Sequence, residues 1–397
     1  MTGGSVMDLR WLHGALEAGL HAERRIDPWI RPVLDWALQR PGTWLVQALI
    51  NARRPDEGLA LAEERLDPQE TQLLEQIIAE MRAHLVQDFP PGQMERAGNT
   101  KTHALVRGEL SIRADLPAAL RHGIFASPRT FPAWVRFGGP GPHVPPDIED
   151  VGVLSIGVKL MDVPGPKLLD DERFTQDFTG ISCPTFTTPN SRENAVLQYW
   201  SRRELGLWYF LDPRRPHIGD LLMQGLWSKT QGNPLGSAYY SCVPYLLGEG
   251  QAMQYSFVPA APVEMRIKRL PLRPSPDYLR ENMIKTLAAG DALFTMQLQL
   301  QTDPHRMPIE NASVLWPQSL SPRIPVATLR IPRQTFDSPA QLGFARNLSF
   351  NPWHCIGEHR PLGNLNRARR WLYQELSRFR QSQNGIEHVE PSGTERF

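Results

Sequence analysis

The sequence predicts an α+β protein, with an antiparallel β-sheet, closed or sandwiched, between helical N-terminal and C-terminal additions. Apolar residues repeat at helical spacing near both ends of the chain, whereas polar and apolar residues alternate between them. The 37 prolines fit long fixed loops between strands. We therefore divide the 397 residues into a helical extension (1–95), a β-rich middle (96–350), and a C-terminal loop and helix (351–397).

The clearest helix signal is the stretch "LDPQETQLLEQIIAEMRAHLVQDFPPG". Asp67 is a candidate N-cap, Pro68 suits the first helical position, and Glu70 lies three residues after the cap. Apolar residues then follow at helical spacing until Pro90-Pro91-Gly92 ends the helix. Residues 1–66 contain shorter apolar patches such as "WLVQALI", which we also expect to be helical.

From about residue 100 the pattern changes to a period of two. In the stretch "LFTMQLQLQ", Phe294, Met296 and Leu298 alternate with polar residues, as a strand with one buried face requires. Many strands separated by Pro/Gly-rich loops favour a closed or sandwiched antiparallel sheet. The other strand candidates are "HALVRGELSIRAD", "AWVRFG", "VGVLSIGVKLMDV", "MQYSFVP" and "VATLRIP".

The composition of the chain limits the kind of binding partner and the cellular compartment that we expect. The formal net charge is +1, so bulk charge does not favour a nucleic-acid or membrane partner, and we expect a small molecule. Cys183, Cys242 and Cys355 form no CxxC pair, which fits a reducing compartment. The N-terminus lacks a basic segment followed by an apolar run, and no stretch is apolar enough to span a membrane. We therefore expect a cytoplasmic protein without an integral membrane segment.

The stretch "NRARRWLY" carries the first candidate chemistry. In a helix over 364–380, Arg369 and Tyr373 are one turn apart, so the guanidinium faces the phenol. A neighbouring cation favours the ionised phenol, and a phenolate is an iron ligand. The alternative is that Tyr373 packs among leucines of the same helix while the arginines are solvated.

Several motifs occur in the order found in the catalase superfamily, and they resemble most closely the small catalase-like haem proteins. They are "KTHALVRGELSIRADLP", "PAWVRFGG", "LSIGVKLMDV", "TQDFTGISCPTF" and "RARRWLY". The resemblance runs over residues 95–380. It implies a catalase-like closed antiparallel β-barrel, a bound haem b and a homo-oligomer, in which residues 1–95 could be an assembly arm.

The resemblance also implies roles for individual residues. His103 corresponds to the distal histidine, Tyr373 to the tyrosine that binds the haem iron, and Arg369 to the arginine that steadies it. Arg136 corresponds to an arginine that contacts a haem propionate. Taken alone, a histidine such as His103 on an alternating strand is more often a structural residue, and Arg136 could pair with Asp147 or Glu149.

The sequence departs from the catalase pattern on the distal side. Catalases hold peroxide with an asparagine where this chain has Ile181-Ser182-Cys183, so Ser182 or Asn190 would have to supply that hydrogen bond. Thr102 precedes the histidine where catalases usually have valine, which is similar to the catalase-related allene oxide synthases. A hydroxyl there could bond to the histidine and hinder its proton transfer. Thr100 replaces another propionate-binding arginine.

These departures favour a haem b-dependent enzyme that acts on organic or fatty-acid hydroperoxides, by peroxidation, rearrangement or dehydration, more than on hydrogen peroxide. Val135, Ile156 and Phe186 are candidates for the apolar wall of its pocket. One alternative is a weak catalase or peroxidase acting on hydrogen peroxide, and another is a non-catalytic haem carrier or sensor. A zinc site in "WHCIGEH" is a weaker alternative, because its spacing matches no common zinc motif.

Overall fold

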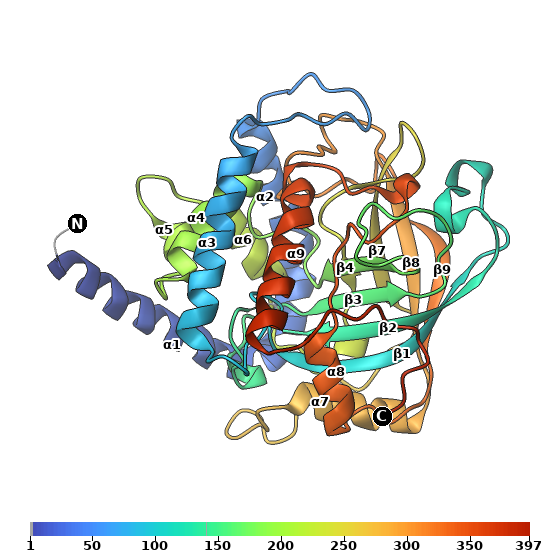
Figure 1. Cartoon of the computed structure of the whole chain (residues 1–397). Coiled ribbons are helices and arrows are strands. Elements are labelled where there is room, and N and C mark those ends of the chain that lie inside the picture. The colour runs from blue at the N-terminus through green and yellow to red at the C-terminus, as the bar shows by residue number, and fades with distance from the viewer. Residues whose placement is uncertain (1–2, 140) are drawn as a thin grey trace.

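A closed antiparallel β-barrel forms the centre of the computed structural model, which describes residues 3–139 and 141–397 (Figure 1). Its strands follow one another as hydrogen-bonded neighbours in the order β5-β4-β3-β2-β1-β9-β8-β7, and pairing of β5 with β7 closes the ring. The closed barrel is therefore confirmed and the sandwich is excluded. The strands are β1 Thr102–Ile112, β2 Thr130–Gly138, β3 Ser155–Leu160, β4 Gln176–Ile181, β5 Tyr239–Tyr240, β7 Ala252–Pro259, β8 Ala292–Leu300 and β9 Ile324–Ile331, with β6 Tyr245–Leu246 paired to β7.

Apolar and aromatic side chains fill the barrel. Phe137, Tyr239 and Phe294 contact one another across it, with ring centroids 5.8–6.3 Å apart. Because neighbouring strand residues point to opposite faces, Val135 belongs to this core while the next residue, Arg136, points outward. Val135 and Ile156 are both buried in this core, and Phe186 is partly buried against it.

The predicted period-two segments all contain strands, but the middle of the chain also holds helices that the sequence analysis did not expect. Three of them follow β4, one precedes β8 and one follows β9. Their short lengths leave little helical periodicity to detect. They are α4 Ser191–Ser201, α5 Trp208–Leu211, α6 Ile218–Trp227, α7 Tyr278–Ala289 and α8 Pro339–Asn347.

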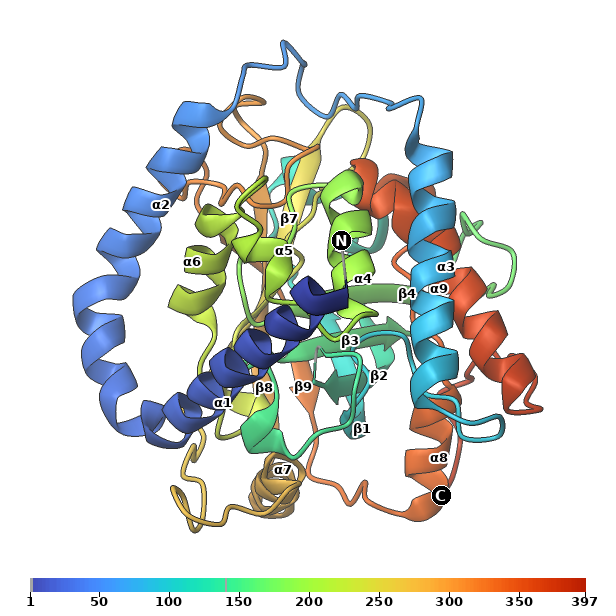
Figure 2. The same cartoon turned by 90° about the vertical axis from the view of Figure 1, so that its left-hand side faces the viewer.

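The N-terminal extension is helical, as expected. Helix α1 (Gly3–Leu34), a π-helical segment (Asp35–Gln39) and α2 (Arg40–Arg53) form an arc on the same side of the barrel as α5 and α6 (Figure 2). Helix α3 (Glu70–Asp88) packs against α4 and α9. It begins three residues after the expected cap, yet the backbone N–H of Asp67 donates to Glu70 Oε1 at 3.2 Å, as in a capping box. No helix in the described part of the chain is both long and apolar enough to cross a membrane.

Helix α9 (Asn364–Gln383) lies on the outside of the barrel near β3 and β4 (Figure 1), and its position agrees with the predicted helix over 364–380. It carries Arg369, Tyr373 and Arg380 at spacings of four and seven residues. These spacings place the three side chains on one face of the helix. The helix therefore presents a phenol flanked by two guanidinium groups.

Candidate functional site

The Arg369 and Tyr373 side chains meet on α9. Arg369 Nη2 donates to the Tyr373 hydroxyl at 3.2 Å and to Thr179 Oγ1 on β4 at 2.6 Å. Its Nη1 donates to Asn366 Oδ1 at 2.9 Å and approaches the Tyr245 hydroxyl at 3.4 Å. Burial opposes the positive charge of Arg369, but the nearby tyrosine oxygens outweigh it and raise the pKa of the guanidinium. The pair is therefore a phenol held beside a permanent cation, and Tyr373 is half-buried rather than packed in a leucine core.

A row of residues across the outer face of the barrel connects this pair with Arg136. Arg136 on β2 pairs with Gly157 on β3, which pairs with Thr179 on β4. Neighbouring strands are about 4.8 Å apart, so Arg136 and Thr179 lie roughly 10 Å from each other with only a glycine between them. The Phe350 ring packs on this glycine, because a Cβ added to Gly157 would lie 2.9 Å from Phe350 Cδ1. The row thus forms a flat floor between an arginine and a cation-backed phenol.

Three arginines gather at the Arg136 end of the row. Burial lowers the pKa of Arg136 to about 9 and that of Arg380 to about 10, and Arg380 further disfavours the charge on Arg136. Burial and both of these cations hold the pKa of Arg96 well below its usual range. Only the Glu95 carboxylate opposes these effects, and the Nε atoms of all three arginines lack hydrogen-bond partners. The cluster therefore has more positive charge than Glu95 compensates, and its free N–H donors could bind an anion.

The sequence analysis missed Arg380 and Arg96. Arg380 could have been found, since it lies seven residues after Tyr373 on the face that carries the phenol. Arg96 lies in an irregular segment before β1, where no periodicity aims its side chain. It donates to the Ala345 carbonyl at 2.8 Å. Thr100 stands where catalases have an arginine, and the Thr100 hydroxyl donates to the Arg96 carbonyl at 2.8 Å. Arg96 thus supplies a guanidinium close to the position where this chain lacks the catalase arginine.

His103 lies in a β-bulge near the start of β1. The register with β2 passes from Thr102 opposite Gly138 to Ala104 opposite Phe137, so His103 is the extra residue. The side chain is buried, and its Nε2 has no hydrogen-bond partner. Burial first, and then the charges of Lys101, Arg136 and Arg280, hold the pKa of His103 well below its usual range. The imidazole is therefore neutral at pH 7, with one ring nitrogen free.

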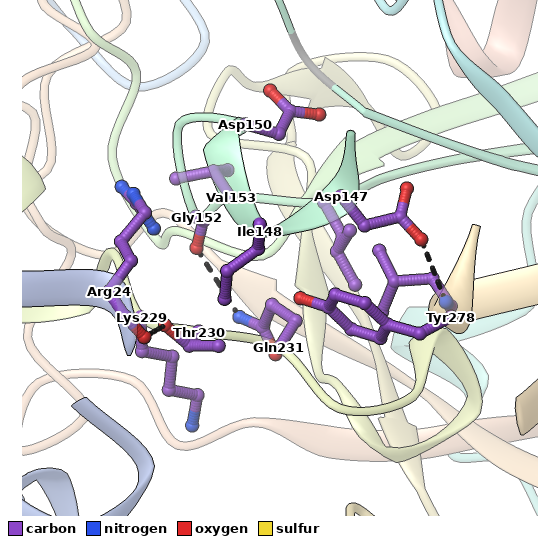
Figure 3. A pocket seen from close by; sticks show the side chains of 12 residues that line it. Arg24, Asp147, Ile148, Asp150, Gly152, Val153, Lys229, Thr230, Gln231 and Tyr278 are labelled. Carbon is purple, nitrogen blue, oxygen red and sulfur yellow. Dashed lines mark hydrogen bonds between the residues drawn. The ribbon is translucent and has the colours of Figure 1, made fainter. Parts of the chain in front are cut away.

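Asp147 faces the other ring nitrogen of His103. Its Oδ1 lies 3.6 Å from His103 Nδ1 and 2.7 Å from Lys101 Nζ, and its Oδ2 accepts from the Leu279 N–H at 2.8 Å. Burial raises the pKa of Asp147 to about 6 despite the lysine. A small pocket adjoins this carboxylate, with Tyr278 on its wall (Figure 3). Asp147 is a residue that the sequence analysis named only as a possible partner of Arg136.

Several residues that the sequence analysis proposed for the distal side make contacts other than the expected ones. Thr102 Oγ1 accepts from Arg136 Nη2 at 2.7 Å, so its hydroxyl bonds to the arginine. Ser182 Oγ accepts from the Leu154 N–H at 2.8 Å. Asn190 caps α4, where its Oδ1 accepts from the Glu193 N–H at 3.0 Å. These contacts leave His103 as the distal group with a free polar atom.

The alternative pairing of Arg136 with Asp147 or Glu149 is also wrong. Arg136 Nη2 donates to the carbonyls of Asn99 and Thr100 at 2.7 and 3.2 Å in addition to Thr102. Asp147 contacts Lys101 instead, and Glu149 lies 3.9 Å from Arg25. The charge of Arg136 is thus compensated mainly by backbone carbonyls.

The residues of "WHCIGEH" do not converge on one point. His354 Nδ1 lies 2.9 Å from Asp177 Oδ2, and its Nε2 lies 3.0 Å from Asp171 Oδ1. His359 Nε2 instead accepts from the Ile124 N–H at 3.1 Å, and burial raises the pKa of the Cys355 thiol. The zinc alternative for this motif is therefore wrong.

Comparison with known proteins identifies the fold. No protein-family model matches the sequence, and no curated protein is similar to it. Solved structures do match. A fungal catalase is 15% identical, with a TM-score of 0.57 over 83% of this chain and 66% of its own. Catalase A from Saccharomyces cerevisiae is 14% identical (TM-score 0.57, 83% and 68%), and a bacterial catalase is 16% identical (TM-score 0.55, 86% and 70%).

The protein therefore has the catalase fold, and the catalase-like barrel that the motifs implied is confirmed. The chain spans about two thirds of the length of these catalases. In this chain, His103, Arg136 and Thr179 lie on the barrel strands β1, β2 and β4. The fold brings His103 and the pair of Arg369 and Tyr373 to one side of the barrel, although His103 and Tyr373 are about 270 residues apart in the sequence.

Proposed function

We propose that this chain binds haem b on the outer face of its barrel and is an enzyme that acts on peroxides, organic or fatty-acid hydroperoxides in particular. One observation carries the proposal. A phenol backed by a cation and a cluster of three arginines lie at opposite ends of a floor whose middle residue is Gly157. Such a site has an oxygen ligand for iron at one end and donors for carboxylates at the other.

The residues fit the cofactor that the catalase resemblance implies. Haem b is planar and carries two propionates, which would neutralise the excess charge of Arg96, Arg136 and Arg380 and accept from their free Nε atoms. Gly157 leaves the floor flat, although the Phe350 ring has to turn aside before a planar group can lie on it. The buried and unpartnered Nε2 of His103 also fits a polar ligand on the distal side.

The chain's own residues have clear tasks in this arrangement. Tyr373 would hold the iron through its oxygen, to which the guanidinium of Arg369 donates at 3.2 Å. Bound ferric haem supplies the metal on which a peroxide O–O bond is cleaved. Thr179 on β4 and Asn366 on α9 fix Arg369 from two sides, so the oxygen and its cation keep their positions.

His103 moves the proton. Since its imidazole is neutral, Nε2 can take a proton from the incoming hydroperoxide and return it to the leaving oxygen. The Asp147 carboxylate beside Nδ1 favours the tautomer with hydrogen on Nδ1 and the lone pair on Nε2. Lys101 holds that carboxylate at 2.7 Å and so fixes its orientation.

The distal side supports an organic substrate over hydrogen peroxide. The stretch that corresponds to the catalase asparagine reads Ile181-Ser182-Cys183, and the Ser182 hydroxyl already accepts from the Leu154 backbone N–H. A small peroxide would have His103 alone to hold it, whereas an alkyl hydroperoxide gains binding energy from its apolar tail.

The test is the absorbance spectrum of the haem-supplemented protein beside its Tyr373→Phe variant, followed by turnover of cumene hydroperoxide, a fatty-acid hydroperoxide and hydrogen peroxide. We expect one haem per chain with a phenolate-ligated ferric spectrum that the variant loses. We also expect turnover of the organic peroxides that falls about 100-fold or more in His103→Ala. Absence of haem uptake would refute the proposal.

The other functions give different results. A haem carrier or sensor would bind haem, and His103→Ala would change no measurable turnover. A weak catalase would release oxygen from hydrogen peroxide, and Ser182→Asn would increase that release. Oxygen release at the rate of a true catalase would refute the preference for organic substrates.

A further inference from the structure

We propose that His84, Asp88 and His143 form a binding site for a divalent transition-metal ion of the Zn²⁺ type, apart from the haem site. His84 and Asp88 lie one turn apart on α3, and His143 belongs to the loop between β2 and β3. One ligand atom of each residue lies within 4.8 Å of the others. Two imidazoles and a carboxylate are a donor set that zinc prefers.

The spacing of the donors fits a tetrahedral ion. His84 Nε2 and His143 Nδ1 each lie 3.1 Å from Asp88 Oδ2. Zinc bonds of about 2.0–2.2 Å separate adjacent tetrahedral ligands by roughly 3.3 Å, so small movements of the side chains would admit the ion. His84 Nε2 makes no hydrogen bond in spite of the short distance. The imidazole and the carboxylate thus converge on a common point instead of bonding to each other.

The site has a burial gradient that leaves one side open to water. The side chains of His84 and Asp88 are 8% and 17% exposed, whereas that of His143 is 53% exposed. Three protein ligands leave the fourth tetrahedral position for a water molecule. The ion would therefore enter from the His143 side.

Charge at the site also suits a cation. Within residues 3–139 and 141–397, Asp88 lies close to the two histidines and forms no ion pair with a lysine or arginine. A bound cation would compensate this carboxylate.

In a second cluster of possible metal-binding side chains, a lysine compensates the negative charge of the carboxylates. Glu172, Asp177 and His354 are fully buried and also bring three donor atoms together. The ammonium of Lys159 already lies among them, in contact with both carboxylates. A lysine supplies the positive charge there, so the second cluster is a charge network of the protein itself. Of the two clusters in the described part of the chain, the one that contains His84 has no such lysine.

The position of the site indicates a structural role. It joins α3 of the N-terminal extension to the loop that leads, four residues after His143, to Asp147 beside the distal histidine. An ion bound by both segments would restrain that loop against α3. The inference stands on these residues alone and does not depend on haem binding.

The test uses the full chain after removal of metal with a chelator. Zn²⁺ affinity is measured by competition with a chromophoric chelator, and the Co²⁺ form is examined by visible absorption. We expect one ion per chain and a Co²⁺ spectrum of tetrahedral intensity. His143→Ala and Asp88→Asn should each weaken Zn²⁺ binding about tenfold or more.

His305→Ala is the matched control, because His305 Nδ1 also faces a carboxylate, Asp56, at 3.6 Å on another part of the surface. It should leave the Zn²⁺ affinity unchanged. His143→Ala removes a half-exposed loop side chain and should keep the metal-free melting temperature within about 2 °C. Unchanged Zn²⁺ affinity in His84→Ala/His143→Ala, or less than one equivalent of binding to the wild type, would overturn the proposal.

Discussion

Arg369 Nη2 lies 3.2 Å from the hydroxyl oxygen of Tyr373, one helical turn further along α9. The same guanidinium donates to Thr179 on the barrel at 2.6 Å, so the helix and the sheet both determine where the cation lies. A lysine has no planar group with several donors and could not make all of these bonds from one position. The phenol therefore has a cation that is fixed in place and always charged.

Replacement of Arg369 by leucine should weaken haem binding about 10–100-fold, because a group that supports a metal ligand contributes this much to affinity. The measurement is a haem titration followed by absorbance, with the phenolate band recorded from pH 5 to pH 10. Arg378→Leu, an exposed arginine of the same helix, is the control and should bind haem as the wild type does. Equal affinities for the two variants would contradict the assigned role.

Arg380→Met should stabilise the haem-free protein and weaken its haem affinity. Arg380 is 3% exposed, and its charge lies near those of Arg96 and Arg136 with Glu95 as the opposing group. An apolar side chain of similar volume removes a desolvated charge, a change that is often neutral or stabilising by about 1–4 kcal/mol. Urea denaturation without haem and a haem titration provide the two readouts.

The same substitution at Arg378 separates this effect from a general change in helix α9. Arg378 has a side chain that is 57% exposed, so Arg378→Met should change the free energy of unfolding by less than about 0.5 kcal/mol. If Arg380→Met destabilised the haem-free protein and left haem affinity intact, the arginine cluster would be a structural feature and not an anion site.

The barrel and α9 could be predicted from the sequence because their patterns are long and regular. In β8, Phe294, Met296 and Leu298 alternate with polar residues, so only one orientation of the strand buries all three apolar side chains. The pair of Arg369 and Tyr373 followed from helical spacing alone. These are local relationships, which a single sequence records directly.

The rest of the site depends on contacts between distant segments. Asp147 reaches His103 through an irregular loop, and Arg96 reaches the arginine cluster from a segment without periodicity. Thr102 bonds to Arg136 because a bulge and the β1–β2 register bring them together. No spacing rule predicts such contacts, which is why the expected threonine-to-histidine bond was not found.

Gly157→Ala should destabilise the protein by about 1–3 kcal/mol, because the new methyl group would meet the Phe350 ring at 2.9 Å in a packed contact. The loss should shrink to less than about 1 kcal/mol in a Phe350→Ala background, where nothing covers the glycine. The measurement is a double-mutant cycle by urea denaturation of the haem-free protein. Additive effects would show that Phe350 does not lie on the glycine in solution.

The stability of the helices beside the barrel should depend on the charge of His217, just before α6. Its ring stacks on Tyr209 with centroids 4.3 Å apart, and its Nε2 lies 3.1 Å from Glu193 Oε2. Hydrogen bonds to Asp220 and Glu193 raise the pKa of His217 to about 9. A raised pKa means that the folded state binds the proton more tightly than the unfolded state does.

The sign of the pH effect follows from this difference. The contribution of His217 is complete below its unfolded pKa of 6.5 and is lost as the pH rises through about 9. We expect the free energy of unfolding to fall by about 1–2 kcal/mol more between pH 6 and pH 10 in the wild type than in His217→Gln. Urea denaturation of both proteins at the two pH values measures this difference. The pKa of His354 is also raised to about 9, but both proteins contain His354, so its contribution cancels in the comparison. Parallel pH profiles would show that the imidazolium does not stabilise the contact between α4 and α6.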